Sequence, residues 1–179
     1  MPRSARSNRT GNRILDRLPE EEYQRLLPLW EPISLPHGLE VCRQNGPMPH
    51  AYFPTGGMCS IVGTTDEGKV VETTTVGNEG MIGIPVLLGL DFSPSTAISQ
   101  VSGKGLRMPV PSFLRALEVG GMLDKLLRRF IAFSLRYAYQ TAVATEPRPV
   151  SGIAGARKNE AAQRGHKHES CKAFHSKPP

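Results

Sequence analysis

Residues 70–97 constrain the fold most, because four different kinds of local structure follow one another within this stretch. The first part, 70–76, is rich in Val and Thr, whose restricted χ1 angles favour a strand over a helix. Gly77-Asn78 then predicts a turn with positive φ, which both residue types tolerate. The apolar segment 81–89 is interrupted by Gly and Pro, so it predicts one buried turn of helix before a polar corner rich in Ser and Pro.

Short β-type runs separated by turn residues continue on both sides of this stretch. Their spacing of about eight to twelve residues is typical of a jelly-roll-like barrel or sandwich. The composition agrees, since 18 Gly and 16 Pro with only 6 % aromatic residues fit a loop-rich β domain better than a helical bundle. The predicted strands are 33–35, 39–43, 51–53, 58–64, 69–76, 96–101 and 106–109.

Helical patterns flank the strands. Apolar residues at helical spacing before Pro19 predict a first short helix, and the Glu residues at 20–22 begin a second. Trp30 is expected to pack where this second helix meets the strands. A third short helix is predicted after Pro111, and the two glycines at 120–121 end it.

The last periodic segment, 121–145, predicts a long helix with two apolar faces. Because one small β domain cannot cover that much apolar surface, we expect one face to pack on the strands and the other on a second copy of the chain. A monomer in which the whole helix is core is the alternative. The predicted dimer interface is Leu123, Leu126, Phe130, Phe133 and Tyr137, and the face toward the strands is Leu127, Ile131, Leu135 and Ala138.

Several further motifs accompany this pattern: Tyr52-Phe53-Pro54, Gly57, Asp66-Glu67-Gly68, the run from Val76 to Gly83 and the long helical pattern from Gly121. Together they resemble the sensory domain of Crp/Fnr-type bacterial transcription regulators, and the resemblance extends over about residues 12–143. It implies a mainly β fold with flanking helices: a cyclic-nucleotide-binding-type β-roll, also called a double-stranded β-helix or jelly roll, plus a long C-terminal dimerisation helix. Residues 77–97 then correspond to the phosphate-binding cassette of that family, called the cassette below.

The resemblance also implies where a ligand would bind. In the family, a Glu after the Gly of the short helix binds the ribose, and an Arg in the polar corner pairs with the cyclic phosphate. Here Ile84 follows Gly83, and the corner 93–97 contains no Arg, so tight binding of cyclic AMP is not expected. A weaker anion or an empty, purely structural cassette remain as alternatives. The candidate ligand-binding residues are Gly80, Met81, Ile82, Gly83, Ile84, Ser95 and Thr96.

The net charge of +6 belongs to the two ends of the chain, because the part between them carries about as many acidic as basic residues. We therefore divide the chain into a disordered basic arm (1–11), a folded domain (12–145) and a disordered basic tail (146–179). Specific DNA binding by this chain alone is not expected. The abrupt change in composition after Ala144, where the family has a winged helix-turn-helix, is interpreted as a truncation, a frameshift or a natural stand-alone form.

Other classes of function find no support in the sequence. There is no catalytic constellation, so an enzyme and a cofactor are not expected. Cys42, Cys59 and Cys171 have no motif spacing, and the His-rich segment 166–175 fits no closed zinc site, so no metal site is predicted. No signal peptide or membrane-spanning run is present, which predicts a cytoplasmic protein without a membrane partner. The effector is not identified, and the alternatives are a stand-alone dimerising interaction module or an anion or small-ligand receptor with an altered cassette.

Overall fold

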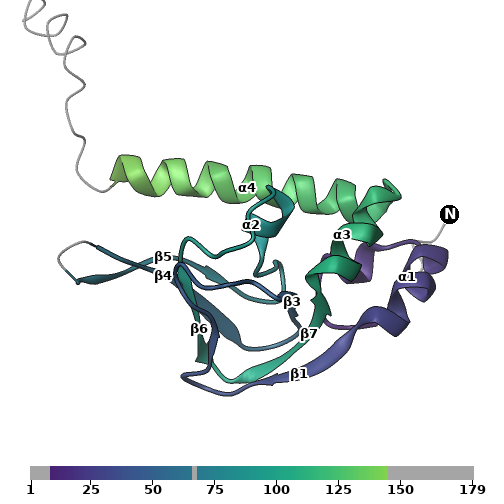
Figure 1. Cartoon of the computed structure of the whole chain (residues 1–179), viewed down its shortest axis with the longest axis horizontal. Coiled ribbons are helices and arrows are strands. Elements are labelled where there is room, and N and C mark those ends of the chain that lie inside the picture. The colour runs from purple at the N-terminus through teal and green to yellow at the C-terminus, as the bar shows by residue number, and fades with distance from the viewer. Residues whose placement is uncertain (1–8, 66–67, 145–179) are drawn as a thin grey trace, which may run out of the picture. The chain divides into compact units, whose positions relative to one another are not determined.

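A computed structural model describes residues 9–65 and 68–144 (Figure 1). Of the described residues, those from 9 to 138 form one compact unit, and 139–144 belong to a second. Two antiparallel sheets make up the β-roll, and the predicted fold class is confirmed. One sheet has the order β1 (Glu31–Leu35), β7 (Gly103–Pro109), β3 (His50–Pro54), and the other β2 (Glu40–Cys42), β6 (Thr96–Val101), β4 (Met58–Thr64), β5 (Val70–Val76).

Helices flank the roll as the sequence predicted, with one difference. The segment before Pro19 is only a 3₁₀ turn, η1, because Pro19 stops the chain before a full α-helical turn has formed. The long helix begins within one residue of its predicted start and extends to Ala144, the last described residue. The helices are η1 (Leu15–Arg17), α1 (Glu20–Leu26), η2 (Leu27–Leu29), α2 (Ile84–Leu87), α3 (Val110–Glu118) and α4 (Met122–Ala144).

An aromatic cluster joins the helices to the sheet of β1, β7 and β3. The ring of Trp30 packs edge-on against Phe53 with ring centroids 4.9 Å apart, and Phe113 from α3 meets Phe53 at 6.1 Å. Phe53 and Phe113 are fully buried, and each such side chain contributes roughly 1.5 to 3 kcal/mol of burial. The predicted position of Trp30 is therefore confirmed.

The end of the predicted N-terminal arm is ordered, which corrects part of that prediction. Arg9 pairs with Glu20 at 2.7 Å and lies over the ring of Tyr23. Thr10 donates both its N–H and its hydroxyl to the carboxylate of Asp16. These contacts hold residues 9–11 to η1 and α1. Residues 1–8 of the arm and the tail from 146 lie outside the described residues.

In the described parts, 9–65 and 68–144, we find no helix that combines the length and the hydropathy needed to span a bilayer.

Candidate functional site

The start of the cassette is fixed to the neighbouring strand β3. Tyr52 and Ile82 exchange two backbone hydrogen bonds, at 2.8 and 2.9 Å, and both Met81 and Ile82 are buried. Gly83 follows with φ of +125°, and the short helix α2 begins directly after it. Since L side chains rarely adopt that φ, Gly83 gives the chain the sharp change of direction that the predicted helical turn needs.

The predicted turn after β5 is present at Gly77-Asn78, and neither residue needs positive φ to form it. The carboxylate of Glu79 reaches back and accepts a hydrogen bond of 2.8 Å from the Gly77 N–H. A Cβ at Gly77 would meet that carboxylate oxygen at 2.8 Å, so a larger residue there would displace the end of the Glu79 side chain. Glu79 is thus a turn residue.

The polar corner uses two of its three hydroxyls, those of Ser93 and Thr96, within the chain. The Ser93 hydroxyl donates to the Ser95 carbonyl at 2.6 Å, and the Thr96 hydroxyl accepts from the Gln44 N–H at 3.0 Å. The Ser95 hydroxyl makes no hydrogen bond to any described residue, and Ser95 is half-buried. The corner therefore offers an anion one free hydroxyl and no cation.

The predicted ligand residues lie in two segments, 80–84 at the start of the cassette and 95–96 in the polar corner. No hydrogen bond between described residues joins these two segments. Ile84, at the position where the family has a Glu, is the first residue of α2 and is half-buried. Its side chain has no hydrogen-bonding group for a ribose. Whether Gly80, Met81, Ile82, Gly83, Ile84, Ser95 and Thr96 contact a ligand stays a prediction.

The two described cysteines are free and buried. Burial, helped by the nearby Cys42, raises the pKa of the Cys59 thiol to about 11, so this group stays protonated near neutral pH. Among residues 9–65 and 68–144, no group of three or more His, Cys, Asp or Glu side chains could hold a metal ion. The His-rich segment lies outside these residues.

The cassette is in contact with the long helix α4. The ring of Phe130 lies over Gly80, where an added Cβ would come within 2.6 Å of the ring. On the other side of Gly80, its carbonyl accepts a hydrogen bond of 2.9 Å from the amide of Asn12. Gly80 is thus enclosed between the N-terminal segment and α4, which the sequence did not predict.

The five residues predicted for a dimer interface have three different environments. Leu123 is completely buried in the core of its own chain, as is Leu127, so Leu123 has no surface left for a partner and is removed from the predicted interface. Leu126 and Phe130 are half-buried against the core. Phe133 and Tyr137 remain 63 % and 48 % exposed, so they are the residues of the predicted seam that could face a second copy.

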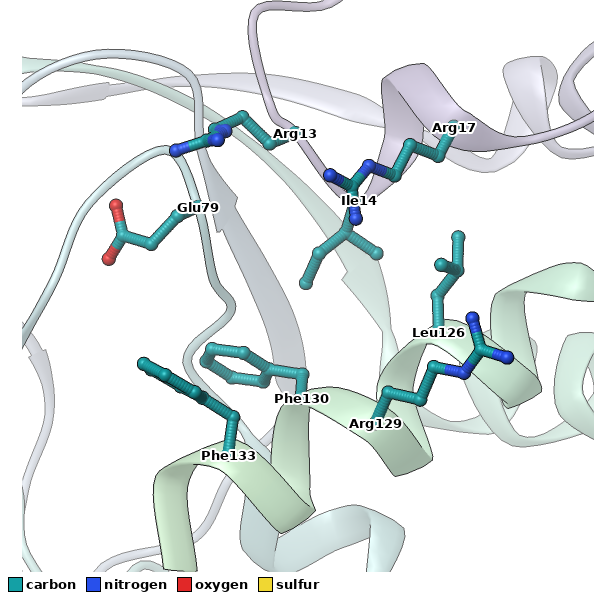
Figure 2. A pocket seen from close by; sticks show the side chains of 8 residues that line it. All are labelled: Arg13, Ile14, Arg17, Glu79, Leu126, Arg129, Phe130 and Phe133. Carbon is teal, nitrogen blue, oxygen red and sulfur yellow. The ribbon is translucent and has the colours of Figure 1, made fainter. Parts of the chain in front are cut away.

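A pocket of about 340 Å³ opens where α4, the cassette turn and η1 meet (Figure 2). Apolar side chains line one part of it, and the others are charged. The pocket could not be predicted from the sequence, because its residues come from three segments far apart in the chain. The apolar lining is Ile14, Leu126, Phe130 and Phe133, and the charged lining is Arg13, Arg17, Glu79 and Arg129.

Comparison with known proteins agrees with this architecture. Residues 32–119 match the family model of the cyclic nucleotide-binding domain. No curated protein matches the chain at a significant level.

Solved structures with the same fold have low sequence identity to this chain. A cyclic nucleotide-binding domain from Methylobacillus flagellatus has a TM-score of 0.68 and 10 % identity, with 79 % of this chain and 85 % of that one covered. The N-terminal domain of a transcriptional regulator from Streptomyces coelicolor has a TM-score of 0.55 and 20 % identity, covering 80 % and 99 %. The Thermus thermophilus catabolite activator protein has a TM-score of 0.61 and 17 % identity, covering 73 % of this chain and 62 % of its own.

Proposed function

We propose that this chain is the sensor domain of a bacterial transcription regulator of the Crp/Fnr type, that it acts in the cytoplasm, and that it pairs with a second copy through α4. The observation that carries this proposal is the contact between Gly80 of the cassette and Phe130 of α4. A change in the cassette would have to move the ring of Phe130, and with it the helix that is proposed to pair. The match to the cyclic nucleotide-binding domain over residues 32–119 supports the sensor part.

The proposed sensor does not bind cyclic AMP tightly. A cyclic phosphate needs a cation or several donors, and the corner supplies only the free hydroxyl of Ser95. Ile84 offers the ribose no hydrogen bond. An Arg–phosphate pair contributes about 1.5 to 3 kcal/mol net, so its loss alone weakens binding by about tenfold or more.

Calorimetry with cyclic AMP and cyclic GMP tests this directly. We expect no binding at micromolar or lower dissociation constants, on the order of −8 kcal/mol or better. The double variant Ile84→Glu with Ser95→Arg restores both types of side chain and should bind cyclic AMP measurably. Ile84→Gln with Ser95→Gln is the matched control, because it changes the same positions without adding charge. Tight binding by the unchanged protein would contradict the proposal.

Two other functions remain from the sequence. A stand-alone dimerising module would pair through α4 like the proposed sensor domain, but it would bind no ligand. A receptor for an anion or small ligand is favoured by the pocket beside the cassette. The proposal assigns sensing and pairing to this chain, and it does not assign sequence-specific DNA contact to it.

A further inference from the structure

We propose that the pocket between η1, the cassette turn and α4 binds a small aromatic anion, such as an aryl carboxylate or an aryl phosphate. This inference goes beyond the proposed function, because the pocket lies outside the cassette's predicted ligand residues, and it shares Phe133 with the proposed pairing face of α4. Figure 2 shows arginine side chains from η1 and its preceding residues on one wall, and two phenylalanine rings from α4 on another.

The charges of the pocket point to an anion. Arg13, Arg17 and Arg129 line it together with a single carboxylate, that of Glu79. Within the described part of the chain, none of the three guanidinium groups makes an ion pair or a hydrogen bond. The Glu79 carboxylate is already hydrogen-bonded to the Gly77 N–H, so it is held in its own turn. The pocket thus presents an excess of cations, and a guanidinium binds carboxylate and phosphate oxygens in pairs.

The apolar lining indicates that the uncharged part of the ligand is an aromatic ring. Phe130 and Phe133 extend from successive turns of α4 toward the cassette turn, and Ile14 is buried at the side of η1 (Figure 2). Phe133 is 63 % exposed, so a flat ring placed on it would remove apolar surface from water. A volume of about 340 Å³ is at the lower end of the range for small-molecule sites, which favours a ligand of one or two rings.

Binding at this place would reach the cassette. Arg13 directly follows Asn12, whose amide donates to the carbonyl of Gly80, and the ring of Phe130 also lies against Gly80. A ligand seated on Phe130 and next to Arg13 therefore contacts one neighbour of Gly80 directly and lies beside the residue that follows the other. The pocket would sense a ligand different from the one that the cassette of this fold is built for.

The test uses 8-anilinonaphthalene-1-sulfonate, a fluorescent aromatic anion, and N-phenyl-1-naphthylamine, which has the same rings without the sulfonate. We expect the full chain to bind the anion more tightly than the neutral probe. We expect about threefold to tenfold weaker affinity for the anionic probe, and unchanged affinity for the neutral probe, in each of three single variants: Arg13→Gln, Arg17→Gln and Arg129→Gln. Arg25→Gln is the control, because Arg25 is exposed on α1, makes no described contact and does not line the pocket.

Competition then identifies the anionic group. 1-Naphthoate and 1-naphthyl phosphate should each displace the anionic probe, and 1-naphthalenemethanol should not. The competitor with the higher affinity shows whether the pocket prefers a carboxylate or a phosphate. Equal binding of the two fluorescent probes, or no effect of all three Arg variants, would overturn the proposal. An affinity for the anionic probe that falls as the protein concentration rises would also overturn the proposal, because a second copy of the chain would then occupy the pocket. The Gln variants replace exposed side chains, and circular dichroism verifies that they fold.

Discussion

At the scale of single residues, Asn12 has more structural importance than its polar side chain suggests. It is completely buried, and its amide donates to the carbonyls of Pro54 and Gly80 at 2.8 and 2.9 Å. Its side-chain oxygen accepts from the N–H groups of Ile14 and Leu15, so the same residue caps η1. One amide therefore joins the N-terminal segment, strand β3 and the cassette.

Replacing Asn12 by Ala should lower the free energy of unfolding by about 2 to 4 kcal/mol, because two carbonyls and two N–H groups lose their partner in a buried place. Urea unfolding followed by circular dichroism measures the effect. Asn78→Ala is the matched control: Asn78 is exposed and its amide makes one hydrogen bond, to the Gly11 carbonyl, so the loss there should stay below about 1 kcal/mol. Equal effects of the two substitutions would show that Asn12 is not the joint described.

Residue by residue, the sequence predicts what local chemistry determines. The strands, Trp30 and the lack of a corner Arg follow from residue type and spacing, and the structure has the first two as predicted. The role of Asn12 could not be predicted, because its partners lie 42 and 68 residues away along the chain. For the same reason Arg13, Arg17 and Arg129 looked like ordinary surface charges in the sequence.

At the scale of elements, the beginning of α4 is fixed by a residue of α1. The Glu22 carboxylate accepts hydrogen bonds from the N–H groups of Met122 and Leu123, at 2.8 and 3.0 Å. It satisfies free donors at the helix start and places a negative charge at the positive end of the helix dipole. Gly121 leaves room for that carboxylate, since a Cβ there would overlap it. The glycines at 120–121 were predicted only as a helix break, and one of them also makes space for the cap.

Glu22→Ala should therefore destabilise the chain by about 1 to 2 kcal/mol. Hydrogen exchange should rise mainly in the first turn of α4, where the N–H groups of Met122 and Leu123 lose their acceptor. Glu22→Gln keeps an acceptor without the charge and should have a smaller effect. Glu21→Ala, one residue away on α1 and exposed, should leave that turn unchanged. Faster exchange spread evenly over the chain would argue against a local cap.

In α4, the position of the helix was easier to predict from the sequence than the burial of its side chains. The periodicity identified an apolar helix of the right length, but both predicted faces turned out to be mixed. Leu123 and Leu127, from different predicted faces, are both buried, while Phe133 and Leu135 are both at least half exposed. Burial on α4 changes along its length, since Leu123 and Leu127 pack in the core and Phe133 and Leu135 do not. A spacing rule cannot detect such a change.

At the scale of the whole molecule, the exposed part of α4 decides whether the chain pairs. Phe133 and Tyr137 lie four residues apart on one side of the helix and are 63 % and 48 % exposed. Exposed aromatic side chains at this spacing are typical of a helix that packs on another helix. In a symmetric dimer each of these residues would meet its own copy or a near neighbour across the two-fold axis.

Phe133→Glu with Tyr137→Glu should then dissociate the dimer, because burying two added carboxylates opposite two others is strongly unfavourable. Sedimentation at protein concentrations on the order of tens of micromolar should give a dimer for the unchanged chain and a monomer for the double variant. Val119→Glu is the control, since Val119 has the same exposed fraction of 63 % as Phe133 but follows α3. The variant should keep its fold, because the core is supplied by residues such as Leu123, Leu127 and Phe113, which it does not touch. If the unchanged chain sediments as a monomer at these concentrations, the proposed pairing through α4 is wrong. The arginine-lined pocket is tested separately, because the probe-binding experiments do not require a dimer.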